Sequence, residues 1–138
     1  MQIELGMSKG QLVALQFGQV NVAASQSDVQ LTGAGVSGAA DGYVVPFNGQ
    51  ILAVTYALSA AATAGSLTVG PTINGTEKTD PKLTVTTGTG GYDWAPRDTA
   101  NFAAGDKIGA EVTTTAAWDA TTADLTVVVW VVVDVEGV

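Results

Sequence analysis

The residues of this chain that could carry out chemistry are nearly all carboxylates. Among its 138 residues there is no cysteine and no histidine, which excludes thiolate chemistry, Cys/His zinc sites and a Ser-His-Asp triad. Asp93 and Asp98 flank Trp94, and two carboxylates beside an aromatic ring are the residue types of a glycoside hydrolase site. Spacing within a loop fixes no distance between two carboxyl groups. Hydrolysis by this pair therefore stays an alternative, and the favoured interpretation is a protein without enzymatic activity.

A second pair of carboxylates, Asp119 and Asp124, brackets a turn and could offer oxygen ligands to calcium. The local charge is low and no calcium-loop pattern is present, so the favoured interpretation gives both residues a structural role in the turn. Gly65 and Gly70 have the spacing of a phosphate loop but lack the Lys-Ser/Thr ending. We predict no cofactor and no metal.

Charge restricts the possible partners. The chain has 13 acidic and 5 basic residues, for a net charge of −8, and its lysines and arginine are scattered. Nucleic acid and anionic membrane surfaces both require clustered basic side chains, so neither is predicted as a partner. No apolar run approaches the roughly 20 residues that a membrane-spanning helix needs.

Apolar residues recur with a period near two between turn residues, which predicts strands throughout and no helix. The expected fold is all-β, an antiparallel β-sandwich of jelly-roll type. Strands are expected at residues 11–17, 28–32, 43–47, 50–58, 66–73, 82–87, 106–115 and 125–135. Asn48-Gly49 and Asn74-Gly75 each predict a tight hairpin, because both residue types tolerate positive φ. In the strand at 50–58, one face is expected in the core: Leu52, Val54, Tyr56 and Leu58.

The strand at 125–135 is apolar on both faces. One face carries Val127, Val129, Val131 and Val133, and the other carries Val128, Trp130 and Val132. Successive side chains of a strand point to opposite sides, and an antiparallel sandwich usually leaves one side of each sheet in water. A second copy of the protein is the expected cover for the second face. Only 13% of the residues are charged, which also favours association.

Two further segments are candidates for contacts with partners. Residues 88–104 are expected to form a long irregular loop that contacts a partner or ligand, and its candidate residues are Tyr92, Trp94, Arg97 and Phe102. Residues 1–18 are expected to form an N-terminal arm or a first strand, followed by the sandwich domain at 19–138. The arm would anchor the protein to a particle through Leu12, Leu15 and Phe17.

Five segments follow one another in this order: 45–54 (VPFNGQILAV), 64–69 (AGSLTV), 73–76 (INGT), 101–109 (NFAAGDKIG) and the terminal valine-rich strand. This order resembles small jelly-roll proteins of tailed-bacteriophage particles, namely capsid decoration proteins and fibre-tip domains. It is also similar to trimeric jelly rolls of the C1q and tumour-necrosis-factor type. The resemblance implies a homotrimer on the exterior of the virion that contacts the major capsid protein or another virion protein. The alternative it implies is a carbohydrate- or receptor-binding domain at a fibre tip.

Overall fold

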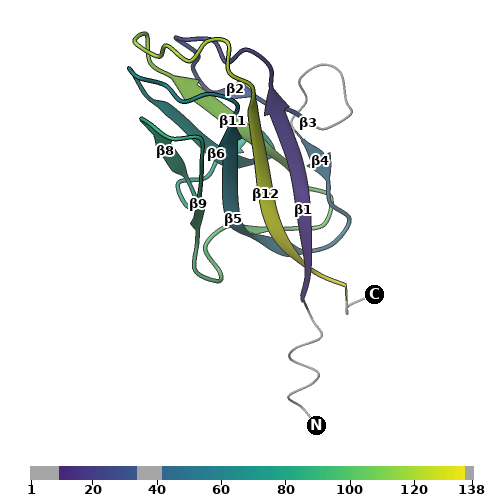
Figure 1. Cartoon of the computed structure of the whole chain (residues 1–138). Coiled ribbons are helices and arrows are strands. Elements are labelled where there is room, and N and C mark those ends of the chain that lie inside the picture. Colours follow the sequence, from purple (N-terminus) through teal and green to yellow (C-terminus); the bar gives the residue numbers. More distant parts are fainter. Residues whose placement is uncertain (1–9, 34–41, 136–138) are drawn as a thin grey trace.

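The segments in which apolar residues recur at every second position form two antiparallel sheets that pack face to face (Figure 1). The computed structural model describes residues 10–33 and 42–135. In sheet A the order is β10 (Asn101–Phe102), β5 (Gly49–Leu58), β12 (Leu125–Asp134), β1 (Gly10–Gln19) and β3 (Thr32–Gly33), and β9 (Gly90–Trp94) also pairs with β5. In sheet B the order is β2 (Val29–Gln30), β11 (Lys107–Thr114), β6 (Leu67–Ile73) and β7 (Thr76–Glu77); β4 (Tyr43–Val44) pairs with β11 and β8 (Leu83–Val85) with β6. The predicted all-β sandwich is confirmed.

The described residues contain no helix, and hence none long and apolar enough to cross a membrane. One core lies between the two sheets. Its largest fully buried side chains come from both sheets and from the segments that join them: Phe17, Val22, Leu31, Ile51, Val54, Leu67, Val69, Ile108, Val112, Val127, Val129 and Val131.

Strand β12 occupies the middle of sheet A, with β1 on one side and β5 on the other (Figure 1). Val127, Val129 and Val131 point into the core and are completely buried. A valine-rich strand exposed at a sheet edge would be a template for aggregation, and a central position satisfies its backbone on both sides.

The two Asn-Gly pairs have different outcomes. Asn74 and Gly75 have φ values of 53° and 82° and join β6 to β7, so the second hairpin is confirmed. The first prediction is wrong, because β4 pairs with β11 in sheet B whereas β5 lies in sheet A. Asn48 sits at this crossing between sheets: its carbonyl accepts from Asp134 N at 2.9 Å and its Oδ1 accepts from Ala104 N at 2.9 Å.

A bulge changes the predicted inner face of β5. Trp130 pairs with Ala53 and Val131 with Ile51, so Leu52 has no partner on β12. Ile51 therefore takes the buried position expected for Leu52, while Val54, Tyr56 and Leu58 are buried as predicted.

Two other sequence predictions need correction. Residues 88–104 are not one irregular loop, because they contain β9 and β10, both paired with β5. Of the two alternatives for residues 1–18, a first strand is what residues 10–18 form, as part of β1. This strand extends to Gln19 and belongs to the sandwich, so the expected boundary after residue 18 falls inside it. The remainder of the expected arm, residues 1–9, lies outside the described residues.

Candidate interaction surface

Sheet A presents a second set of side chains on the side away from the core, which we call the outer A face. Strand register places these residues in two rows that cross β9, β5, β12 and β1. The first row is Tyr92, Thr55, Val128 and Gln16, and the second is Trp94, Ala53, Trp130 and Ala14; Val132 and Leu12 follow beyond the second row. None of these residues is charged. Across four strands the rows span about 15 Å, three inter-strand spacings.

The centre of the outer A face is formed by β12. Val128, Trp130 and Val132 remain half-buried within the single chain, unlike the fully buried valines on the inner side of the same strand. The indole Nε1 of Trp130 donates a hydrogen bond to Thr55 Oγ1 at 3.3 Å, which holds the ring against β5. The polar atom of the indole is thus satisfied, and its apolar surface is available for a contact.

Larger apolar side chains stand at the two sides of this centre. Tyr92 is 69% exposed and Trp94 is 65% exposed on β9, and Leu12 is 62% exposed on β1. Tyr92 and Trp94 are two residues apart on one strand, so both rings project from the same face. The sequence predicts that both residues lie in an irregular loop. They lie instead on a strand, which fixes the direction of both rings.

Two other residues of segment 88–104 predicted to contact a partner, Arg97 and Phe102, do not lie in the two rows of the outer A face. Phe102 is a core residue, only 6% exposed, so the prediction that it contacts a ligand is wrong. Arg97 donates from Nε to Gln50 Oε1 at 3.1 Å, and Gln50 Nε2 donates to the Pro96 carbonyl at 2.8 Å. The 96–97 backbone is thereby fixed beside the outer A face, and Gln50 is buried beneath it.

The predicted anchoring residues divide between the two faces of β1. Phe17 is 2% exposed, and its ring lies 5.4 Å from that of Tyr43, so it is a core residue and cannot anchor the chain to a neighbour. Leu15 is half-buried on the same inner side. Of the three, Leu12 alone points outward with most of its surface exposed.

Strand β1 also forms an edge of sheet A along most of its length. Among the described residues, β3 pairs with it only at Phe17 and Gly18. On the inner side of this edge lies an apolar groove of about 470 Å³, whose lining includes Val13, Leu15 and Val44. Val13 is 38% exposed and Val44 is 60% exposed, so apolar surface continues around the edge strand from the outer A face.

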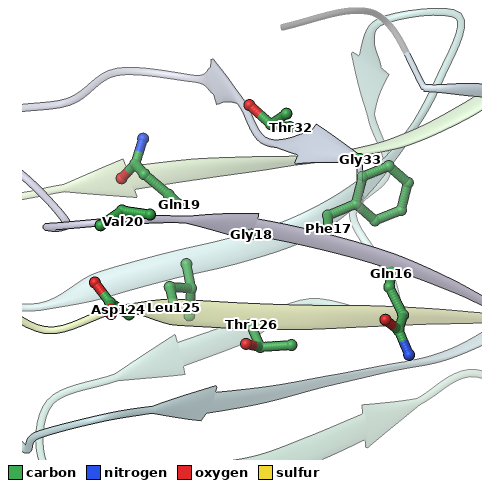
Figure 2. A pocket seen from close by; sticks show the side chains of 10 residues that line it. All are labelled: Gln16, Phe17, Gly18, Gln19, Val20, Thr32, Gly33, Asp124, Leu125 and Thr126. Atoms are coloured by element: carbon green, nitrogen blue, oxygen red, sulfur yellow. The ribbon is translucent and has the colours of Figure 1, made fainter. Parts of the chain in front are cut away.

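A hollow at the other end of β1 has a mixed lining without converging polar groups (Figure 2). It lies beside Gly18, where a Cβ would come within 2.9 Å of the Leu125 carbonyl oxygen. Its one charged residue, Asp124, accepts a hydrogen bond from Asn21 N at 3.1 Å. The carboxylate thus fixes a turn.

The two carboxylates considered for hydrolysis face different surroundings. Asp93 Oδ2 accepts from Lys82 N at 2.9 Å and links β9 to the segment that precedes β8. Asp98 has a φ of 66° and lines a separate hollow with Asn101 and Phe102. The structure gives Asp93 a role in joining the edges of the two sheets.

Asp119, the other carboxylate considered for calcium, stabilises a turn. Its Oδ1 accepts from Thr63 N at 2.9 Å and Ala64 N at 3.2 Å, and its Oδ2 accepts from the Thr63 hydroxyl. The hydrogen bonds from Thr63 are the largest cause of a lowered pKa of the Asp119 carboxyl. These donors occupy both oxygens, in agreement with the structural role favoured for this residue.

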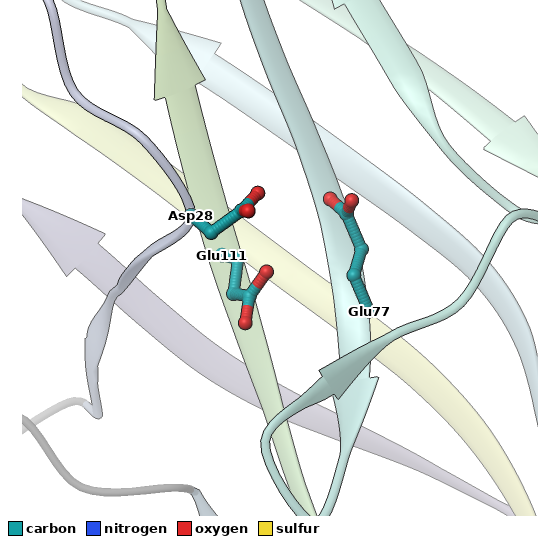
Figure 3. Close-up of side chains that lie close together, drawn as sticks. All are labelled: Asp28, Glu77 and Glu111. Atoms are coloured by element: carbon teal, nitrogen blue, oxygen red, sulfur yellow. The ribbon is translucent and has the colours of Figure 1, made fainter.

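Sequence reasoning missed a group of three acidic residues on the outer face of sheet B. The ligand oxygens of Asp28, Glu77 and Glu111 lie within 4.8 Å of one another (Figure 3). They come from the residue before β2, from β7 and from β11, so as many as 83 positions separate them in the sequence. No local motif connects them, and pairing of the strands brings them together.

Burial and like charge dominate the electrostatics of this acidic group. Glu111 is 6% exposed, and burial, followed by the charges of Asp28 and Glu77, raises the pKa of its carboxyl. Lys82 Nζ contacts Glu77 Oε1 at 2.9 Å and offsets part of the negative charge.

The chain matches no protein-family model and no curated protein sequence. Function is therefore inferred from the surfaces of the fold.

Proposed function

We propose that this protein is a structural component of a bacteriophage particle, a decoration protein that assembles as a homotrimer and binds the exterior of the capsid. The observation that carries the proposal is the outer A face, whose two rows carry no charge, with Trp130 at its centre and Tyr92, Trp94 and Leu12 exposed around it. Tryptophan and tyrosine side chains within such a patch are typical of the residues that dominate the free energy of association.

Burial of this face by a sister subunit has a clear driving force. Each large side chain removed from water contributes about 1.5–3 kcal/mol when fully buried, and the half-buried residues of β12 contribute a fraction of that. The two rows that cross β12 at Val128 and Trp130 contain no charge that would have to be desolvated; Arg97 and Asp134 lie at one end of the face, beside Val132. The apolar edge of β1 continues the surface and would be shielded in the same step.

The choice of a trimer and of a capsid partner comes from the resemblance of segments 45–54 and 101–109 to phage jelly-roll proteins. A decoration protein acts by burying surface area, which agrees with a chain that lacks histidine and cysteine. The acidic group of Asp28, Glu77 and Glu111 lies on the outer side of sheet B, on the opposite side of the sandwich from the outer A face.

Native mass spectrometry at micromolar concentration tests self-assembly. We expect a trimer for the wild type and a monomer for Leu12→Glu, which places a charge on the outer A face. Val20→Glu is the matched control, because Val20 is 72% exposed in the turn after β1 and is not part of the outer A face. A monomeric wild type would overturn the assembly proposal.

Co-sedimentation with empty phage heads that lack the protein tests the capsid role separately. Wild type is expected to pellet with the heads and Leu12→Glu to remain in the supernatant. A trimer that never pellets would remove the decoration role and leave self-assembly standing.

One observation favours a second candidate, a carbohydrate-binding domain. Tyr92 and Trp94 project side by side from an edge strand and are both about two-thirds exposed, an arrangement on which a sugar ring can stack. Binding to a glycan array that is lost in Trp94→Ala, together with a monomeric wild type, would support this candidate over the first.

A further inference from the structure

We propose that the outer face of sheet B binds one divalent cation, of the calcium class, through Asp28, Glu77 and Glu111, with the side-chain oxygens of Thr72 and Gln30 completing the site. The proposal is independent of the assembly function above, and it differs from the absence of a metal predicted from the sequence.

The three carboxylates are already arranged as ligands of one ion. Calcium is coordinated by oxygen at about 2.3–2.6 Å, so two ligands of the same ion lie at most about 5 Å apart. The oxygens of Asp28, Glu77 and Glu111 lie within 4.8 Å of one another (Figure 3). The carboxylates therefore need no large rearrangement to share an ion.

Two buried oxygens beside the carboxylates are unsatisfied, which is the independent sign of a missing ligand. The Thr72 hydroxyl is fully buried and has no hydrogen-bond partner. Thr72 pairs directly with Glu77 across β6 and β7, so both side chains project from the same face of the sheet. A buried hydroxyl without a partner is destabilising, and a cation would satisfy its oxygen.

Gln30 contributes the second unsatisfied oxygen. It pairs with Glu111 across β2 and β11, and its Nε2 donates to Glu111 Oε1 at 3.1 Å. The other atom of the same amide, Oε1, is buried and has no partner. The hydrogen bond holds the amide at the acidic group, and an amide oxygen is a typical calcium ligand.

Gly70 clears the space in which Glu77 approaches Glu111. Gly70 lies opposite Glu111 on β6, and a Cβ at this position would come within 2.8 Å of Glu77 Oε2. The absence of a side chain thus allows the Glu77 carboxylate to lie across β6. Lys82 contacts the other oxygen of this carboxylate, Oε1.

The charge of the group also favours a divalent cation. Three carboxylates face one another and Lys82 supplies the single positive charge with an ion pair to them among the described residues. Protonation is the other way to relieve their repulsion, and the raised pKa of Glu111 is consistent with it. A bound cation removes the repulsion without a proton, and the all-oxygen, flexible ligand set suits calcium better than the strict octahedron of magnesium.

Isothermal titration with CaCl₂ and thermal unfolding in calcium or EDTA test the site on the full-length chain. We expect one ion per chain, a dissociation constant of about 0.1–1 mM and a melting temperature that rises with calcium. Asp28→Asn should weaken binding by about tenfold or more, because it removes one of the three charged ligands. Asp28 is exposed and has a φ of 48°, which asparagine also adopts, so this variant is expected to fold.

The matched control is Asp98→Asn, which removes the same charge from an exposed position with a φ of 66° and should bind calcium like the wild type. Glu111→Gln is a second variant and should also lose binding. Absence of heat and of any thermal shift at about 10 mM calcium would overturn the proposal. An equal shift in Asp28→Asn and Asp98→Asn would also overturn it, because it would show general screening of the net charge. Binding of MgCl₂ in preference to CaCl₂, lost in Asp28→Asn, would overturn the assignment to calcium.

Discussion

The outer faces of the two sheets differ although they enclose the same core. On sheet A the outward positions in the middle of β12 hold Val128, Trp130 and Val132, and the rows at Val128 and Trp130 carry no charge. Asp134 is the last outward residue of the strand. On sheet B the equivalent positions of β11 hold Gly109, Glu111 and Thr113. Both strands place mostly apolar side chains in the core, so the contrast between the two sheets arises from the outward residues.

The two outer faces of this small sandwich therefore suit two different kinds of contact. A partner on the outer A face would meet a hydrophobic surface with no charge in its two rows. A ligand on the opposite side would meet converging oxygens above Gly70, where the lack of a side chain leaves room for the Glu77 carboxylate. Each face can be altered without touching the inward residues of its own strands.

The largest expected effect compares a glycine from each sheet. A Cβ at Gly49 would come within 2.4 Å of the Val132 carbonyl oxygen and 2.6 Å of the Phe102 ring, whereas at Gly70 it meets the end of the flexible Glu77 side chain. Gly49→Ala should lower the free energy of unfolding by about 3 kcal/mol, and Gly70→Ala by less than about 1 kcal/mol. Urea unfolding in EDTA measures both. Equal losses of unfolding free energy would show that the surroundings of Gly70 are as rigid as those of Gly49.

The second prediction separates the two sides of β12. Val129→Ala removes buried methyl groups from the core and should cost about 2 kcal/mol of unfolding free energy. Val128→Ala on the outer A face should cost about 1 kcal/mol or less in a monomer, because this residue is half-buried. Urea unfolding of dilute protein measures both values. If Val128→Ala costs as much as Val129→Ala at every protein concentration, the outer A face is not an interface.

The third prediction concerns pH and the acidic face. The pKa of Glu111 is raised in the folded protein above its ordinary value of 4.5, so the folded state binds more protons than the unfolded state above that pH. Stability should therefore fall as pH rises from about 4.5 towards neutrality, and Glu111→Gln should remove this contribution. Unfolding of both proteins in EDTA at several pH values measures the difference.

Comparison of the wild type with Glu111→Gln separates the contribution of Glu111 to the pH dependence from the contributions of the other carboxylates. A backbone hydrogen bond from Ala103, and then one from the Asn74 side chain, lower the pKa of Asp106, whose stabilisation is lost only as pH falls below 3.8. Asp106 is unchanged in Glu111→Gln, so its contribution cancels. Parallel stability profiles for the two proteins above pH 4.5 would contradict the prediction.

The smallest expected effect on stability is that of Trp94→Ala. Trp94 is 65% exposed on an edge strand, so truncation should change the free energy of monomer unfolding by about 0.5 kcal/mol or less. The same change should weaken trimer formation measurably, because an exposed indole on the outer A face is buried only in the assembly. Sedimentation equilibrium measures the association. A trimer of unchanged affinity would exclude β9 from the interface.

The sequence predicts the strands well where the two-residue period is strong. The two faces of β12 follow directly from alternation: Val127, Val129 and Val131 share one face, and that face is buried in the core. The bulge at Leu52 depends on pairing with β12, more than 70 residues away in the sequence, so no local pattern reveals it.

Local turn signals are ambiguous for the same reason. Asn48-Gly49 and Asn74-Gly75 are identical dipeptides, yet only the second has positive φ at both residues. Tertiary hydrogen bonds from Asp134 and Ala104 fix the first as a crossing between sheets. The acidic group shows the same limit, because its members meet through strand pairing and share no sequence motif.

The central position of β12 also affects the order in which the fold can form. β1 and β5 precede β12 in the chain, and they are not neighbours in the finished sheet because β12 lies between them. Sheet A must therefore stay open until residues 125–134 have left the ribosome, and loop closure over about 110 residues makes this step slow. Until then, the edges of β1 and β5 that later pair with β12 remain without a partner strand.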